Sequence, residues 1–279
     1  CLNMVAVSLF GELEFWFALI KVVAIIAFIL VGAYMILTHY TTDIGTASIT
    51  NLWSHGGFFP TGAKGFILAF QMVTFAFAGI ELVGLVAGET ENPEKVLPEA
   101  INNIPIRIIL FYLGSLFVIM AIYPWNSLNP DNSPFVEVFS EIGITIAASL
   151  INLVVLSAAA SACNSAIYST GRMLRSLAQE GSAPKKFKKL TTHHVPGNAL
   201  TFSTIVIFIS VILNYVMPSE VFTLVSSIAT TCFLFIWSML VYTHMKYRKS
   251  ILGKKAHSFK MPLYPFSNYL VFLYMAFVC

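Results

Sequence analysis

The stretch FAFAGIELVGLVAGETENPEK, residues 75–95, begins as a membrane helix and does not continue as one. It carries a carboxylate, Glu81, inside an apolar run, with Gly79 just before that acid and Gly84 and Gly88 after it. An acid placed in hydrocarbon costs about 2.5 kcal/mol or more unless it is paired, protonated or in contact with water. Glycine is poorly suited to a helix interior. We therefore predict that the helix over residues 65–88 is broken near residue 79.

The composition places this stretch in a membrane protein. Of the 279 residues, 57% are hydrophobic and only 10% are charged, and the mean hydropathy is +0.80. A water-soluble domain needs far more charge on its outside. Continuous apolar runs of the roughly 18–25 residues that cross a bilayer indicate helices rather than a β-barrel. The sequence therefore predicts an all-α polytopic membrane protein.

About seven helices are expected, in a single membrane domain over residues 1–279. The predicted spans are 10–37, 65–88 with its break near 79, 104–123, 141–165 with a polar continuation, 199–217, 220–247 and 265–279. The last span is expected to be truncated, and both chain ends resemble cuts, so we expect an internal piece of a longer chain. The four cysteines lack metal-binding spacing, and no cofactor or metal is expected.

Basic residues predict the orientation of these helices. Lysine and arginine gather in the segments 89–107, 172–198 and 246–262, whereas the loops expected at the opposite ends of the helices hold a single lysine, Lys64. Basic loops remain in the cytoplasm, which assigns the first three segments to the cytoplasmic side. Basic clusters can also bind nucleic acid, but between membrane spans that interpretation is poor, and no nucleic-acid partner is expected.

Glu81 has two interpretations. Irregular backbone at membrane depth is tolerated where it lines a cavity or is buried in protein, and discontinuous helices form the substrate sites of secondary transporters. In that case the opened carbonyl groups would accept hydrogen bonds from a substrate ammonium. The alternative is a buried acid that ties two helices together, with Gly84 and Gly88 as a packing face.

Lys21, in the run FWFALIKVVAIIAF, is the second ionisable candidate. Burial disfavours a charged amine, so Lys21 could take up and release a proton during a transport cycle. Alternatively, its long side chain could extend to the nearby cytoplasmic interface. Phe75, just before the break, could gate a substrate or simply pack. The polar residues Ser157 and Ser161 are expected to form hydrogen bonds across helices.

No constellation typical of an enzyme is present in the sequence, since it contains no nucleophile elbow, phosphate-binding loop or paired metal ligands. Four stretches instead resemble a known family: FGELEFWFALIKVVAII, FAFAGIELVGLVAGETENPEKVLPEAINNIPIRIILFY, NSAIYSTGRMLRSLAQEGSAPKKF and VPGNALTFS. They are similar to the bacterial amino acid permeases of the amino acid–polyamine–organocation superfamily. Within that superfamily, the sequence of these stretches is most similar to the D-alanine/D-serine/glycine permeases.

This resemblance implies part of a bundle of two inverted five-helix repeats, entered here at its fifth span. It implies proton-coupled uptake of a small neutral amino acid through the cytoplasmic membrane of a bacterium. The substrate ammonium would meet the carbonyls of Ala78, Gly79 and Ile80, and Phe75 would be the aromatic gate. Glu81 matches the family's acid at the break. The glycine-rich motif of the first span, which grips the substrate carboxylate, has no match in the chain.

The resemblance also places Lys21 where related sodium-driven carriers hold a cation. Two alternatives stay open. The first is a sodium-coupled carrier of the same architecture, against which the amine of Lys21 argues. The second is a membrane sensor that transports nothing, which would leave the acid and the break unexplained. The partners expected are an amino acid, protons and the lipid bilayer, and the sequence leaves the oligomeric state open.

Overall fold

The computed structural model describes residues 7–85, 90–128, 133–142, 145–192, 195–250 and 259–279. Within these ranges the chain is helical, apart from turns, bends and an isolated bridge between Thr41 and Thr46. The prediction of an all-α polytopic protein is therefore confirmed. Gly88, which the sequence offers as part of a packing face, lies outside the described residues.

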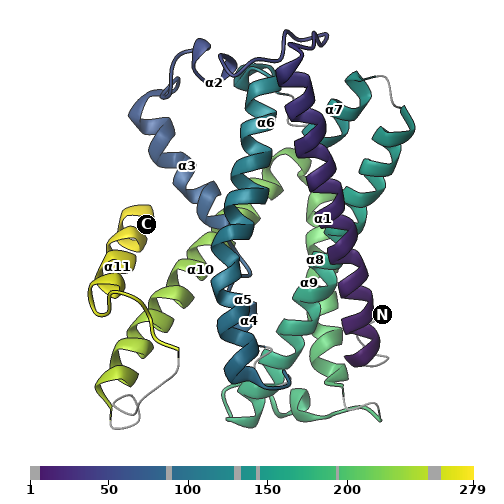
Figure 1. Ribbon diagram of the computed structural model, residues 1–279. Coiled ribbons are helices and arrows are strands. Elements are labelled where there is room, and N and C mark those ends of the chain that lie inside the picture. The colour runs from purple at the N-terminus through teal and green to yellow at the C-terminus, as the bar shows by residue number, and fades with distance from the viewer. Residues whose placement is uncertain (1–6, 86–89, 129–132, 143–144, 193–194, 251–258) are drawn as a thin grey trace. The chain divides into compact units, whose positions relative to one another are not determined.

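Figure 1 shows how the helices follow one another along the chain. The α-helices are α1 (Val7–Leu37), α2 (Asn51–Ser54), α3 (Gly62–Ala76), α4 (Leu82–Leu85), α5 (Pro93–Arg107), α6 (Gly114–Ile122), α7 (Pro134–Glu141), α8 (Thr145–Gln179), α9 (Gly197–Val216), α10 (Pro218–Lys249) and α11 (Phe266–Val278). A π-helical segment, Ile108–Leu113, joins α5 to α6, and short 3-10 turns lie at Trp125–Ser127 and Lys185–Lys188.

Five helices in the described part of the chain are long and apolar enough to cross a membrane, and α3 and α11 are shorter apolar helices. The five cover Phe15–Leu37, Pro93–Ile122, Ala148–Gln179, Gly197–Val216 and Val221–Lys249. Many of their large apolar side chains are exposed, as with Leu30 at 65%. Such exposure suits a surface that faces lipid rather than water.

One expected cytoplasmic loop is largely helical. The sequence places residues 89–107 in a loop and begins the next helix at 104, whereas α5 already begins at Pro93. That expectation was wrong, because a proline can begin a helix as well as end one. Proline is well tolerated at the first position of a helix, where its missing N–H would have no partner anyway. Pro105 lies inside α5, just before the π-helical segment at residues 108–113.

The span expected over 141–165 is also different in the structure. Glu141 ends a separate short helix, α7, which begins at Pro134. The long helix α8 then begins at Thr145 and runs to Gln179, so the expected polar continuation is helical. The first residues of the expected 172–198 loop therefore belong to α8. The pair Ser133–Pro134 marks the start of α7, with the serine at the cap position and the proline at the beginning of the helix.

The chain divides into two compact units, Cys1–Pro60 with Ile104–Ser210 and Thr61–Asn103 with Val211–Cys279. We describe each by itself, and the single membrane domain over 1–279 stays a prediction. In the first unit, α1 packs against α6, α7 and α8 (Figure 1). Its buried core includes Phe28, Met35, Ile122 and Val138.

Gly32 allows α1 and α6 to approach closely. A Cβ atom built at Gly32 would overlap the side chain of Val118 on α6, and Val118 is itself buried. Small residues at such crossings permit the van der Waals contacts that drive helix association in lipid.

In the second unit, α3 packs against α10 and α11, and α10 packs against α11. Polar side chains contribute to these contacts. The Gln71 amide donates to Ser227 Oγ on α10 (2.6 Å), and Thr74 Oγ1 shares a hydrogen bond with the Tyr274 hydroxyl on α11 (2.9 Å). Thr74 is buried, so α3 is held on two sides just before it ends.

Candidate functional site

The apolar helix α3 ends at Ala76, and α4 does not begin until Leu82. Between them the backbone forms tight turns: the amides of Phe77 and Ala78 donate to carbonyls three residues back, at 3.2 and 3.0 Å. Gly79 has φ of +99°, a conformation that glycine adopts readily and other residues rarely. The turn at Gly79 therefore interrupts the helical path, and backbone groups that a continuous helix would pair internally become open to other partners.

The carbonyl groups of this turn differ in whether they accept a backbone hydrogen bond. That of Gly79 accepts a hydrogen bond from the Leu82 amide (3.1 Å). That of Ala78 accepts no backbone hydrogen bond from any residue that the structure describes. A carbonyl oxygen has two lone pairs, so even the engaged one can accept a second donor. The roles of Ala78, Gly79 and Ile80 in substrate binding stay predictions.

Glu81 is half-buried and has defined partners. Its Oε2 atom accepts a hydrogen bond from the Gly79 amide (3.2 Å) and another from the indole Nε1–H of Trp237 on α10 (3.1 Å). The first bond holds the carboxyl group over the turn, and the second ties the turn to α10. The acid is therefore oriented from both sides, which suits a helix tie and equally suits a positioned proton acceptor.

Phe75 lies one turn before the break and packs on α10, where its ring meets Phe222 edge-on (centroids 6.3 Å apart). It also lines a small cavity of about 60 Å³ between α3 and α10. Gln71 and several hydroxyl-bearing residues of α10 share that lining, namely Thr223, Ser226, Ser227 and Thr230. A cavity of this size with polar groups in its wall is large enough to hold water. Polar side chains therefore lie beside the last turns of α3. The gating role of Phe75 stays a prediction.

Lys21 belongs to the other unit. Its Nζ donates to Ser161 Oγ on α8 (2.8 Å), and Ser161 is only 1% exposed. A lysine whose amine extended to the membrane–water interface would not contact a buried hydroxyl such as that of Ser161. This hydrogen bond therefore directs the Lys21 amine toward α8. Ser157 behaves differently from the expectation, because its hydroxyl donates to the Val154 carbonyl of its own helix (2.8 Å).

Sequence reasoning missed the partners of the break. Gln71 carries a usable signal, since an uncharged amide inside an apolar membrane run needs a hydrogen-bond partner. Trp237 carries no comparable signal, because a tryptophan is ordinary in an apolar helix and its bond to Glu81 spans 156 positions along the chain.

A known protein family matches the amino-acid sequence over its full length. The amino acid permease family matches residues 1–279. The chain belongs to this family. Together with its membrane helices and its bacterial relatives, membership makes this permease chain a multi-pass protein of the cytoplasmic membrane.

Three curated relatives illustrate the match. The uncharacterized transporter YdgF of Bacillus subtilis is 62% identical over 278 residues, and the amino-acid permease AapA of the same organism is also 62% identical over 278 residues. The D-serine/D-alanine/glycine transporter of Escherichia coli K12 is 48% identical over 281 residues. The alignments cover 99% of this chain but only 60–61% of each relative. The permease chain thus spans about three fifths of the length of these relatives.

Proposed function

We propose that the complete protein carries an amino acid across the cytoplasmic membrane. The observation that carries this proposal is the interrupted helix of a permease-family chain, with a carboxyl group held over the interruption. Discontinuous helices place backbone dipoles where a small charged molecule can be bound at membrane depth. An amino acid has both charges in one molecule, and its ammonium group is a donor that carbonyl groups can accept.

In this proposal, the substrate ammonium meets the carbonyls of Ala78, Gly79 and Ile80. The Ala78 and Ile80 carbonyls are better placed for a new donor than that of Gly79, since no described residue donates a backbone hydrogen bond to either of them. Phe75 would close over the substrate from its position one turn earlier. Its contact with Phe222 would then have to loosen or shift when the substrate enters.

Proton coupling is assigned in this proposal to Glu81 and Lys21. Glu81 is held by two donors, the Gly79 amide and the Trp237 indole. A change in its protonation would change the strength of both bonds, because hydrogen bonds to a charged acceptor are roughly twice as strong as neutral ones. Proton uptake at Glu81 would therefore loosen the turn that binds the substrate. Lys21 would exchange its proton beside the hydroxyl of Ser161.

The proposed substrate is a small neutral amino acid such as D-alanine, D-serine or glycine. Support comes from the Escherichia coli relative named as a D-serine/D-alanine/glycine transporter, which is 48% identical to this chain. Hydrophobic pockets discriminate only modestly between side chains that differ by a methylene group, so a panel of substrates is needed. Labelled D-alanine uptake by the complete protein should be inhibited by unlabelled D-serine and glycine and much less by proline or phenylalanine.

The decisive experiment places the complete protein in liposomes and imposes an inward proton gradient in sodium-free buffer. We expect D-alanine to accumulate and the accumulation to collapse when a protonophore is added. Accumulation that needs sodium instead would favour the sodium-coupled carrier. Binding of every substrate tested without flux of any of them would favour the membrane sensor. Lys21 argues against a sodium site, since a cationic amine repels a second cation from its surroundings.

A further inference from the structure

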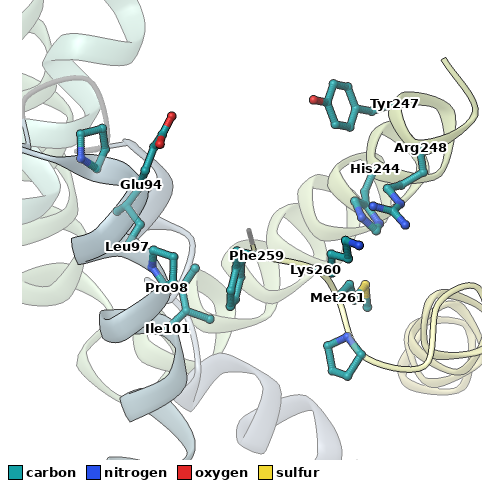
Figure 2. Close-up of a pocket in the computed structure, with 12 residues that line it drawn as sticks. Glu94, Leu97, Pro98, Ile101, His244, Tyr247, Arg248, Phe259, Lys260 and Met261 are labelled. Carbon is teal, nitrogen blue, oxygen red and sulfur yellow. The ribbon is translucent and has the colours of Figure 1, made fainter. Parts of the chain in front are cut away.

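A second, larger cavity lies in the unit formed by 61–103 and 211–279, away from the helix break. It has a volume of about 900 Å³, and its walls come from the start of α5, the end of α10 and the segment before α11. This volume is at the upper end of the range that small-molecule sites occupy. Figure 2 shows the side chains of α5 on one side and those of the α10 end on the other.

The two sides of this cavity differ in charge. Arg248 and Lys260 contribute cationic groups, and Glu94 on α5 lies across the cavity from them (Figure 2). Lys246 and Lys249 share the last turn of α10 with Arg248 but do not line the cavity. The end of α10 is therefore strongly basic, and the cavity has two cations facing one acid.

The cationic side is held in place by neighbouring side chains. The guanidinium of Arg248 lies over the ring of Tyr264, 5.0 Å from its centroid. The ring of His244, which also lines the cavity, meets the same tyrosine edge-on at 5.5 Å. Tyr264 thus packs against both groups, which limits the side-chain entropy lost when they bind a ligand.

His244 offers a hydrogen-bond donor from its Nε2 atom. The side-chain nitrogen of Asn268 lies 3.1 Å from His244 Nδ1 and 3.4 Å from the carbonyl oxygen of Val241. A carbonyl can only accept, so the Asn268 atom facing it is the amide nitrogen, which must also donate to Nδ1. The neutral imidazole then carries its proton on Nε2. Asn268 is fully buried, so this arrangement is fixed from within the protein.

Apolar side chains lie beside the charged groups in this cavity. Leu97, Ile101 and Phe259 line it, and Ile101 and Phe259 remain 40% and 41% exposed. Cations beside exposed apolar side chains at the end of a membrane helix match the two ends of a phospholipid, a phosphate and an acyl chain. The end of α10 is the end predicted to face the cytoplasm, where anionic lipids attract basic residues.

We propose that this cavity binds an anionic phospholipid of the inner leaflet. The lipid phosphate is bound by Arg248, Lys260 and the Nε2–H of His244, and an acyl chain lies along Ile101 and Phe259. Glu94 faces the outer part of the headgroup and limits how much negative charge the site accepts. The proposal does not depend on transport, and its test measures lipid rather than flux.

The test uses native mass spectrometry of the complete protein in mixed micelles containing phosphatidylglycerol and phosphatidylcholine. The wild type should retain one phosphatidylglycerol in preference to phosphatidylcholine. The double variant Arg248→Gln/Lys260→Gln should weaken that retention about thirtyfold, since each basic side chain near an anionic lipid contributes about one kcal/mol. The control Lys246→Gln/Lys249→Gln removes the same charge from the same helix end and should retain the lipid.

Three results would overturn the proposal. Equal loss in the control variant would mean that only the general charge of the helix end matters. Displacement of the lipid by millimolar inorganic phosphate would assign the site to a soluble anion. The variant Glu94→Gln should retain phosphatidylglycerol at least as well as the wild type. Weaker retention in this variant would mean that the bound headgroup presents a cation to Glu94. Thermal unfolding of each variant in detergent distinguishes lost binding from lost folding.

Discussion

Replacing Gly79 with alanine tests whether the interrupted helix matters for transport. Gly79 has φ of +99°, which a residue with a Cβ adopts at a cost of about 1–3 kcal/mol. Steric crowding adds little, because an added Cβ would meet only Leu82 Cδ1, at 3.7 Å. The penalty therefore falls on the turn itself and disfavours the open conformation. At about 1.4 kcal/mol per factor of ten, the population of that turn should fall about 5- to 150-fold.

The assay is the initial rate of labelled D-alanine uptake by the complete protein in liposomes, corrected for the amount of folded protein. Gly84→Ala is the matched control, since Gly84 lies in α4 and a Cβ there would meet nothing within 4 Å. Alanine is favoured over glycine inside a helix, so this control should keep its activity. Wild-type uptake by Gly79→Ala, or an equal loss in both variants, would refute the reasoning.

Three further predictions follow from contacts within each unit. Trp237→Phe removes the indole donor to Glu81; hydrogen bonds to charged groups contribute about 1.5–3 kcal/mol, so uptake should fall about tenfold or more while the protein stays folded. Ser161→Ala removes a buried acceptor of the Lys21 amine and should weaken proton-driven accumulation more than substrate binding, measured as accumulation ratio against Kd. Gly32→Val overlaps the facing helix α6 and should lower stability by about 1–3 kcal/mol in a denaturant titration.

The fold class could be predicted because it depends on composition alone. A chain with so little charge and such long apolar runs can only satisfy its backbone in lipid as helices or a closed barrel. Helix boundaries were harder to predict. Pro93 and Pro134 begin helices outside the predicted spans, because proline occurs both in turns and at helix starts and the sequence alone does not distinguish the two.

The candidate site also has a part that the sequence predicts and a part that it does not. The run around Gly79 and Glu81 stands out in the sequence because an acid and glycines are unfavourable in an apolar helix. Their partners do not stand out, because which helices meet is decided by packing between distant segments. Trp237 is an ordinary residue until α10 meets the turn before α4. The hydrogen bond across helices that the sequence predicts for Ser161 is confirmed, but its partner Lys21 is identified only where α8 meets α1. Long-range pairing of this kind leaves no local signal in one sequence.

Glu81→Gln gives the most direct test of the central claim that the acid over the broken helix couples proton movement to transport. Glutamine keeps an oxygen that can accept from the Gly79 amide and the Trp237 indole, so the turn should persist while the titratable group is lost. In the complete protein, proton-driven accumulation of D-alanine should disappear, while exchange of internal for external D-alanine should continue. Proton-driven accumulation at the wild-type level would contradict the account.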